Sequence, residues 1–127
     1  MILAVDASAL VAIGLDEPER GRFLGVLSAA ETAWVSPINL VEAGAVLSSW
    51  GAVQPDQFAG WLARLKVNET PVSGDAALAA YVRFGRGRHP ARLNLGDCFA
   101  YALAMQLDAP LLFKGDDFAL TDVKRAV

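Results

Sequence analysis

The stretch ILAVDASALVAIGL, residues 2 to 15, holds a single charged side chain, Asp6, among apolar and small neutral residues. Ile2 to Val5 has the short apolar pattern of a strand, and Ser8 to Gly14 is compatible with a helix. An unpaired ionised carboxylate in apolar surroundings is costly or becomes neutral. Asp6 at the end of this strand therefore indicates either a helix cap or a group that binds something.

The composition limits the class of protein. With 127 residues, 54% of them hydrophobic, the chain fits a single domain over residues 1–127 with a sizeable core. It begins on an apolar run without a basic leader, and no uncharged stretch approaches the ~20 residues that span a bilayer, so we expect a cytoplasmic protein with no membrane contact. One cysteine, Cys98, and one histidine, His89, exclude an internal disulfide and a Cys/His zinc site. Any bound metal would be held by oxygen.

Short apolar segments alternate with helix-length segments along the rest of the chain, which is typical of an α/β fold. We expect strands at 2–5, 33–35, 66–72 and 110–113, a weakly indicated fifth near Val123, and helices at 8–14, 18–29, 37–50, 54–65, about 74–84 and 95–107. Because parallel strands need long crossovers, this order favours a mostly parallel sheet covered by helices on both faces.

Carboxylates follow two of the expected strands. Asp6 comes directly after the first strand, and Asp116 and Asp117 lie just beyond the fourth. Ligands of parallel sheets bind outside the carboxyl ends of the strands. We therefore expect a functional site at this edge of the sheet.

Two further acids lie in apolar helical sequence: Glu42 in INLVEAGAVL and Asp97 in LNLGDCFAYALAM. Each acid also has a purely structural interpretation. Asp6 could cap a helix, Glu42 could be an exposed helical acid, and Asp97 could complement a helix dipole, while the Asp116–Asp117 pair could form a turn. The structural interpretation is weakest for Asp97, because its helix has almost no polar face on which a lone acid could be solvated.

Several carboxylates that converge on one place repel one another unless a cation lies between them. Mg²⁺ and Mn²⁺ prefer oxygen ligands and combine a few protein carboxylates with water and substrate phosphate, which suits the cleavage of phosphodiester bonds. The hypothesis from the residues is therefore that Asp6 is a metal ligand.

Other chemistries fit less well. A Ser-His-Asp hydrolase would have to recruit His89, and no G-x-S-x-G motif or Gly-rich phosphate loop is present. A phosphoacceptor domain, with Asp6 as acceptor and Lys114 as its stabilising cation, remains an alternative, although the acids expected next to Asp6 are missing. A non-catalytic α/β interaction module whose acids bind a basic peptide is the other alternative.

A basic cluster stands out against the net charge of −3: Arg83, Arg86, Arg88 and Arg92 fall within ten residues that contain no acid. The cluster is either a solvated helix end and loop or an edge that binds phosphate.

Four runs together resemble the PIN-domain ribonucleases, and specifically the VapC toxins of bacterial toxin–antitoxin pairs. They are VDASALVAI, SPINLVEAG, RHPARLNLGDCFAYALA and LLFKGDDFALTD, in the family's order and spacing over nearly the whole chain. The resemblance implies a five-stranded parallel sheet flanked by helices and an endoribonuclease that hydrolyses RNA with Mg²⁺ or Mn²⁺. It also implies a homodimer that is inhibited by a cognate VapB-type antitoxin.

The resemblance also implies roles for single residues. The catalytic acids would be Asp6, Glu42, Asp97 and Asp116, with Asp6, Asp97 and Asp116 as metal ligands. Ser8 occupies a position where the family often has a polar residue that supports the first acid. Asp117 is a possible auxiliary acid, and we rank Asp116 ahead of it.

Two other groups gain a role from the resemblance. Arg86, Arg88 and Arg92 would form a track for the RNA backbone near Asp97. The aromatic residues around Trp50 and Trp61, with Phe58, are expected to pack in the core, and contact with a partner or a second copy is the alternative.

Overall fold

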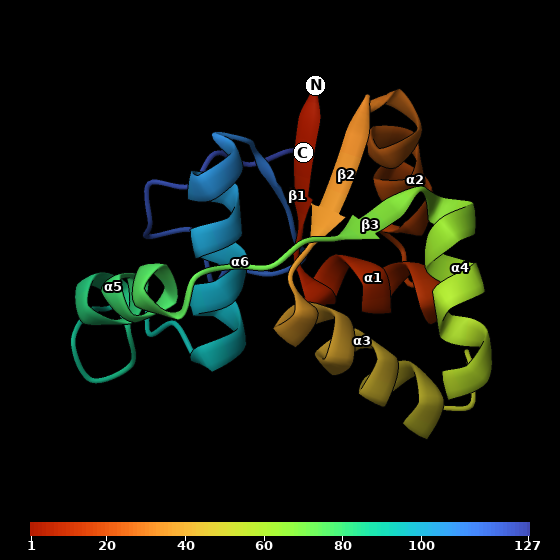
Figure 1. Ribbon diagram of the computed structural model, residues 1–127, viewed down its shortest axis with the longest axis horizontal. Coiled ribbons are helices and arrows are strands. Elements are labelled where there is room, and N and C mark those ends of the chain that lie inside the picture. The colour runs from red at the N-terminus through yellow and green to blue at the C-terminus, as the bar shows by residue number, and fades with distance from the viewer.

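The computed structural model describes residues 1–127 as a four-stranded parallel sheet with helices on both sides (Figure 1). The strands are β1 (Ile2–Val5), β2 (Thr32–Val35), β3 (Val67–Glu69) and β4 (Leu111–Leu112), in the spatial order β3-β2-β1-β4. Every neighbouring pair is parallel. The predicted α/β class and the mostly parallel sheet are confirmed.

The predicted fifth strand near Val123 is reduced to one bridge. Leu111 donates its N–H to the Lys124 carbonyl oxygen at 2.8 Å, and the Ala126 N–H donates to the Leu111 carbonyl oxygen at 3.0 Å. The adjacent strand β4 has only two residues, so it offers a fifth strand little edge to pair with. Lys124 and Arg125 also interrupt the apolar pattern there.

The helices form two groups around the sheet. On one side lie α1 (Ala7–Gly14), α2 (Arg20–Ala29), α3 (Pro37–Ser49) and α4 (Phe58–Leu65), and on the other lie α5 (Gly74–Phe84) and α6 (Leu95–Leu107) (Figure 1). None of these helices has the length and apolar character needed to cross a membrane.

Strand β1 belongs to both hydrophobic cores because its side chains alternate between the two faces of the sheet. Leu3 and Val5 pack in the core beneath α1 to α4, whereas Ala4 packs in the core that contains α5 and α6. All three are completely buried. The strand that precedes Asp6 is thus held on both faces, which fixes the position of that carboxylate.

Local sequence signals place most helix ends. Ser36 caps α3 by accepting the Asn39 N–H at 3.1 Å, with Pro37 as the first helical residue, as predicted. The predicted helix over 54–65 is instead a 3₁₀ turn, η1 (Pro55–Gln57), followed by α4. The two pieces follow each other directly, and the helix changes from the 3₁₀ to the α type at Phe58.

The predicted core role holds for only part of the aromatic group. Phe58 is buried, and its ring centroid lies 5.6 Å from that of the partly buried Trp61. Trp50 is 73% exposed, so the prediction that it packs in the core is wrong. Trp50 lies at the C-cap of α3, beyond the reach of the core under that helix.

Candidate active site

Asp6 lies buried at the carboxyl end of β1 and caps α1. Its Oδ2 accepts the backbone N–H of Ser8 at 3.1 Å and the Ser8 hydroxyl at 2.6 Å. The Ser8 Oγ in turn accepts the backbone N–H of Lys114 at 3.0 Å, which joins this carboxylate to the segment after β4. Only 6% of Asp6 is exposed. Ser8 therefore holds the Asp6 carboxylate through two hydrogen bonds, and its role as an auxiliary residue of a catalytic site stays a prediction.

Asp97 lies in the first turn of α6, the helix that was predicted with the same bounds. It forms a capping box with Asn94: the Asn94 N–H donates to Asp97 Oδ2 at 3.1 Å, and the Asp97 N–H donates to Asn94 Oδ1 at 2.8 Å. Capping thus occupies Oδ2 of both Asp6 and Asp97, and leaves the Oδ1 atoms for another ligand. The structural and the functional interpretations of these two acids are compatible.

Glu42 is exposed on α3, and a buried amide connects it to α6. The Asn39 Nδ2 donates to Glu42 Oε1 at 2.8 Å and to the Gly96 carbonyl oxygen at 3.0 Å. The Asn39 Oδ1 accepts the Ser36 hydroxyl at 2.7 Å. Sequence reasoning missed Asn39 and Gly96, although the i, i+3 spacing of Ser36, Asn39 and Glu42 was visible as a possible row on one helix face.

The acids interact electrostatically. Burial raises the pKa of Asp6 to about 6; the hydrogen bonds from Ser8 lower this pKa, and the charge of Glu42 raises it. Burial also raises the pKa of Asp97 to about 7; the Asn94 N–H lowers it, and the charges of Asp6, Asp117 and Glu42 raise it. Asp6, Glu42, Asp97 and Asp117 are therefore treated as one acidic group, in which the charges of the other three raise the pKa of Asp97.

The two acids beyond β4 differ in their relation to this group. Asp116 and Asp117 are both exposed, and they follow Gly115, whose φ of +100° suits glycine. The charge of Asp117 is among the main influences on Asp97, and that of Asp116 is not. The Asp116 backbone carbonyl accepts the Ala119 N–H at 3.1 Å. The ranking of Asp116 ahead of Asp117 stays a prediction, and the electrostatics favour Asp117.

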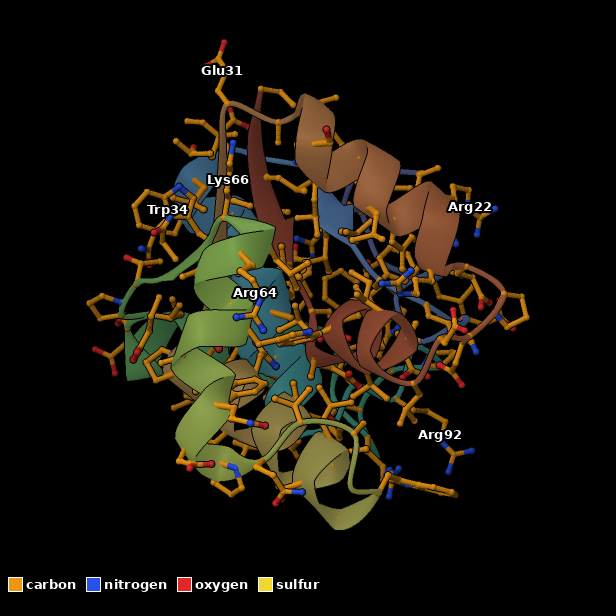
Figure 2. The ribbon with its side chains drawn as sticks, turned by 90° about the vertical axis from the view of Figure 1, so that its right-hand side faces the viewer. Arg22, Glu31, Trp34, Arg64, Lys66 and Arg92 are labelled. Carbon is orange, nitrogen blue, oxygen red and sulfur yellow. The ribbon has the colours of Figure 1, made fainter.

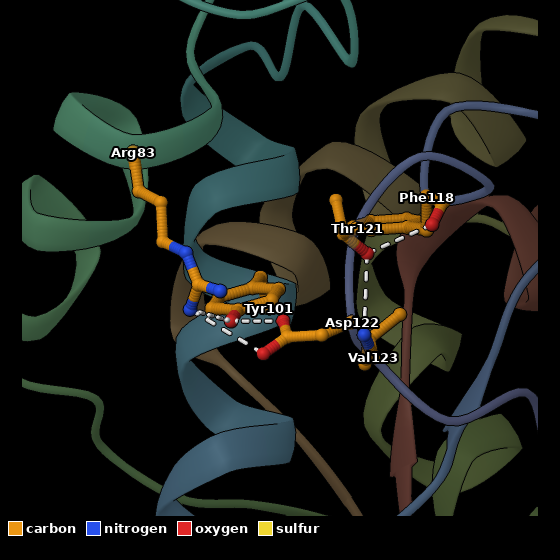
Figure 3. A network of polar contacts seen from close by, with 6 residues as sticks. All are labelled: Arg83, Tyr101, Phe118, Thr121, Asp122 and Val123. Carbon is orange, nitrogen blue, oxygen red and sulfur yellow. Dashed lines mark hydrogen bonds and ion pairs between the residues drawn. The ribbon is translucent and has the colours of Figure 1, made fainter.

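A polar network fixes the segment that carries these two acids (Figure 3). The Tyr101 hydroxyl of α6 donates to Asp122 Oδ1 at 2.5 Å, and the Arg83 guanidinium of α5 lies 3.3 Å from Asp122 Oδ2. The Thr121 hydroxyl donates to the Phe118 carbonyl oxygen at 2.8 Å. Burial and the contact with Asp122 raise the pKa of Tyr101 to about 12. Arg83 therefore anchors the segment after β4 and differs from the other arginines of the basic cluster.

The remaining arginines lie exposed on the loop between α5 and α6. Arg86, Arg88 and Arg92 make no ion pair. The Arg88 guanidinium lies 5.4 Å from the Tyr81 ring centroid, and Arg92 extends away from the molecule (Figure 2). The loop leads directly into Asn94, which caps the helix that carries Asp97. Unpaired positive charge thus lies next to the acidic group along the chain.

The donor atoms suit a hard divalent cation. No three His, Cys, Asp or Glu side chains are arranged to hold an ion by themselves. Mg²⁺ commonly binds through one or two carboxylates and completes its shell with water and substrate phosphate. Asp6 and Asp97, buried at the sheet edge with Oδ1 free of capping contacts, fit that pattern. The largest cleft, of about 670 Å³, lies elsewhere, between α1 and α4 near Trp61, and contains none of these acids.

Comparisons with known proteins identify the family. The family model described as the PIN domain matches residues 3–124 of the chain. The chain is 41% identical to VapC ribonuclease Mb0640 of Mycobacterium bovis, over 95% of each chain. It is 42% identical to the ribonuclease VapC of Mycolicibacterium smegmatis, over 95% of this chain and 97% of the relative.

Two solved structures share the fold. The Mycobacterium tuberculosis toxin VapC20, described as cleaving the sarcin-ricin loop, superposes with a TM-score of 0.75 at 19% identity over 95% of each chain. A chain of a toxin–antitoxin complex from Klebsiella pneumoniae gives a TM-score of 0.73 at 17% identity, over 94% of this chain and 92% of that one. Together with the sequence matches, these findings show that the chain belongs to the PIN-domain family, among its VapC-type ribonucleases.

Proposed function

We propose that this chain is the toxin of a toxin–antitoxin pair and hydrolyses RNA phosphodiester bonds with Mg²⁺ or Mn²⁺ bound at the acidic edge of the sheet. The VapC ribonucleases that it resembles match it over nearly their full length. The observation that carries the proposal is the pair of buried carboxylates, Asp6 and Asp97, on separate elements at this edge.

Each residue has a distinct role in this proposal. Asp6 and Asp97 would hold the cation through their free oxygens, and Ser8 would keep the Asp6 carboxylate oriented. Glu42 would add negative charge beside them and orient water. The cation, when bound, would neutralise charge on the phosphate and lower the pKa of a bound water. Because the pKa of Asp97 is raised to about 7, cation binding would release a proton there.

A fourth acid would come from the segment after β4. Asp116 is the residue that the motif favours, and Asp117 is the one whose charge acts on Asp97. The network of Arg83, Tyr101 and Asp122 would hold either acid at the site by fixing that segment against α6.

The loop arginines would bind the substrate. Arg86, Arg88 and Arg92 are exposed and free of ion pairs, so their guanidinium groups are available to phosphates. Their place next to Asn94 supports a path for the RNA backbone toward Asp97.

The remaining parts of the proposal concern partners. The toxin–antitoxin complex among the structural neighbours supports a VapB-type antitoxin partner. A homodimer is supported by large apolar side chains at the surface, among them Val41 (64% exposed), Trp50 (73%) and Leu95 (70%). Cytoplasmic action follows from the proposed RNA substrate.

The phosphoacceptor alternative loses its cation. The Lys114 Nζ lies 3.2 Å from Glu17 Oε1 and 3.4 Å from Glu19 Oε1, so its ammonium is engaged away from Asp6. Labelling of Asp6 by a small phosphodonor would nevertheless favour the phosphoacceptor alternative over RNA cleavage.

The test in cells is to induce the chain and sequence the 5′ ends of RNA. We expect new ends at a small number of sites, absent after induction of the Asp6→Asn variant. Identical 5′ ends with both chains would contradict the proposed function and leave the interaction module as the better interpretation.

A further inference from the structure

Glycine at position 96 leaves room for the Glu42 carboxylate. A Cβ placed on Gly96 would collide with both Oε1 and Oε2 of Glu42, closer than real Cβ atoms approach any heavy atom. Gly96 is the second residue of α6, directly before Asp97, and its φ is not positive. Its backbone would therefore accept alanine, and the helix would gain from it, since alanine is the better helix former. The three heavy atoms nearest to that Cβ position all belong to the Glu42 carboxylate.

The same carboxylate accepts a hydrogen bond from Asn39, whose Nδ2 lies 2.8 Å from Glu42 Oε1. The amide is completely buried, and all its strong contacts are made within the protein: to Glu42, to the Gly96 carbonyl oxygen and to Ser36. An exposed glutamate on a helix surface needs no such anchor. Here a buried amide uses one N–H on each of two helices, α3 and α6, and so fixes where Glu42 lies relative to the first turn of α6.

This arrangement has an electrostatic cost in the metal-free protein. The Glu42 carboxylate is held against Gly96, the residue directly before Asp97. Like charges held together in this way are unfavourable unless a cation is bound among them.

We propose that Gly96 and Asn39 are positioning residues that keep the Glu42 carboxylate against the first turn of α6, beside Asp97. Gly96 acts by having no side chain, and Asn39 acts by its two N–H groups. The inference rests on the proposed function, because it gives the two residues their effect through the affinity of the site for a divalent cation.

The central variant is Gly96→Ala. The added methyl group must displace the far end of a flexible side chain, so we expect the metal-free melting temperature to stay equal to that of the wild type or to rise. Isothermal titration with Mn²⁺ should show affinity reduced by about 10- to 100-fold, the range typical when a residue that supports a metal site from outside its ligand shell is lost. Glu42→Gln should lower the affinity similarly.

The double variant Gly96→Ala/Glu42→Gln separates positioning from a general effect. If Gly96 acts only through Glu42, the second substitution should cause no further loss of Mn²⁺ affinity once the first is present. Gly25→Ala in α2 is the matched control, because no heavy atom lies within 4 Å of the position that a Cβ would take there, and it should bind Mn²⁺ like the wild type.

Asn39→Leu provides a second route to the same conclusion. It removes both N–H donors at similar side-chain volume and should weaken Mn²⁺ binding. In the double variant Asn39→Leu/Glu42→Gln, the second substitution should cause no further loss of Mn²⁺ affinity. Its melting temperature should fall, because the Ser36 hydroxyl and the Gly96 carbonyl oxygen lose a buried partner. Affinities are therefore compared well below the lowest melting temperature.

Three outcomes would overturn the inference. Wild-type Mn²⁺ affinity in Gly96→Ala, with Glu42→Gln or Asp97→Asn weakened, would leave the proposed function intact and remove the positioning role. A large fall in the metal-free melting temperature of Gly96→Ala would show that the space serves packing. Absence of Mn²⁺ binding to the wild type itself would overturn the proposed cation site along with the inference.

Discussion

At the scale of single residues, Asp6 and Asp97 each do two things. Both cap a helix through Oδ2, and both are more than nine-tenths buried. A cap needs no buried carboxylate, because an exposed one caps equally well. Burial raises the pKa of each carboxyl because the ionised form loses contact with water. A bound cation would offset the free-energy cost of that buried negative charge.

Replacing Asp97 by asparagine should therefore stabilise the metal-free fold. Asparagine keeps an oxygen that accepts the Asn94 N–H and removes the buried charge. Because the folded-state pKa of about 7 exceeds the unfolded value near 3.9, the folded wild type binds more protons than the unfolded chain between these values. Wild-type stability should fall as the pH rises through this window, and the variant should lack that contribution.

The measurement is urea unfolding in EDTA at several pH values. At pH 4 the two proteins should differ little, and at pH 8 the variant should be more stable by on the order of 2 kcal/mol. With Mn²⁺ the wild type should gain more than the variant, since a ligand adds stability according to its occupancy. A variant that is less stable than the wild type without metal, and that responds equally to Mn²⁺, would make Asp97 a structural residue only.

The fourth acid can be assigned by two single substitutions. Because the charge of Asp117 acts on Asp97, Asp117→Asn should lower the Asp97 pKa and reduce the cleavage rate at least 10-fold. Asp116→Asn should have the smaller effect on both. NMR titration of the Asp97 carboxyl and single-turnover cleavage are the measurements, and the reverse order of effects would return the role to Asp116.

The sequence singles out the candidate acids but not the residues that hold one of them. Asp6 and Asp97 stand out because their neighbours are apolar, which is visible along the chain. Asn39 and Gly96 are 57 residues apart, and their roles arise only when α3 and α6 come together. Ranking Asp116 against Asp117 also needs the path of the chain after Gly115, whose φ no local pattern specifies.

At the scale of elements, the loop from Gly85 to Asn94 is braced by hydrogen bonds at its base and at its tip. The Arg86 N–H donates to the Leu93 carbonyl oxygen at 3.1 Å, and the Leu93 N–H donates to that of Phe84 at 3.0 Å. At the tip, the Arg88 and His89 N–H groups donate to the Gly85 carbonyl oxygen at 3.0 and 3.1 Å. A braced loop can present exposed cations in a fixed order next to α6. Binding of the RNA backbone by these exposed arginines stays a prediction.

Substituting Arg86, Arg88 and Arg92 by glutamine should weaken RNA binding and flatten its dependence on salt. Each lost phosphate contact should reduce the slope of log K against log salt by about 0.7 to 0.9. Cleavage of a minimal substrate should fall less than binding of the full RNA. Filter binding at several salt concentrations measures this, with Arg22→Gln on α2 as the control. Unchanged affinity and slope in the triple variant would assign the loop to solvation.

Element boundaries were predictable where a cap marks them. The bounds of α6 were correct because Asn94 caps it, and the start of α3 was correct because Ser36 and Pro37 mark it. The strand expected over 66–72 is only Val67–Glu69, since its pairing with β2 ends at Glu69. The end of β3 depends on the length of its partner β2, which cannot be read from the sequence of residues 66–72.

At the scale of the whole molecule, the helices that cover the small sheet have no further layer of protein outside them. Their outward faces therefore leave large apolar side chains exposed. Exposed side chains on α3, α5 and the start of α6 include Val46, Leu78, Val82 and Leu95, each at least 37% exposed. The four-stranded sheet ends at β4, where the C-terminal segment adds one bridge in place of a strand. Burial of such surface between copies is the reason to expect a dimer.

Sedimentation equilibrium should therefore give the mass of two chains at micromolar concentration and physiological salt. Trp50→Ser and Leu95→Ser test which exposed surface is buried between the two chains. One of the two variants should shift the mass toward that of a single chain without lowering the melting temperature. A wild-type mass of one chain under these conditions would contradict the dimer.

Cleavage of a labelled structured RNA by the purified chain is the direct test of metal-dependent hydrolysis at Asp6 and Asp97. The wild type should cut the RNA with Mg²⁺ or Mn²⁺ and stop when EDTA is added, with activity restored by excess metal. Asp6→Asn and Asp97→Asn should be folded, as judged by circular dichroism, and at least 100-fold slower at saturating metal. Cleavage that continues in EDTA, or that survives in folded Asp97→Asn at the wild-type rate, would contradict metal-dependent hydrolysis at this acidic group.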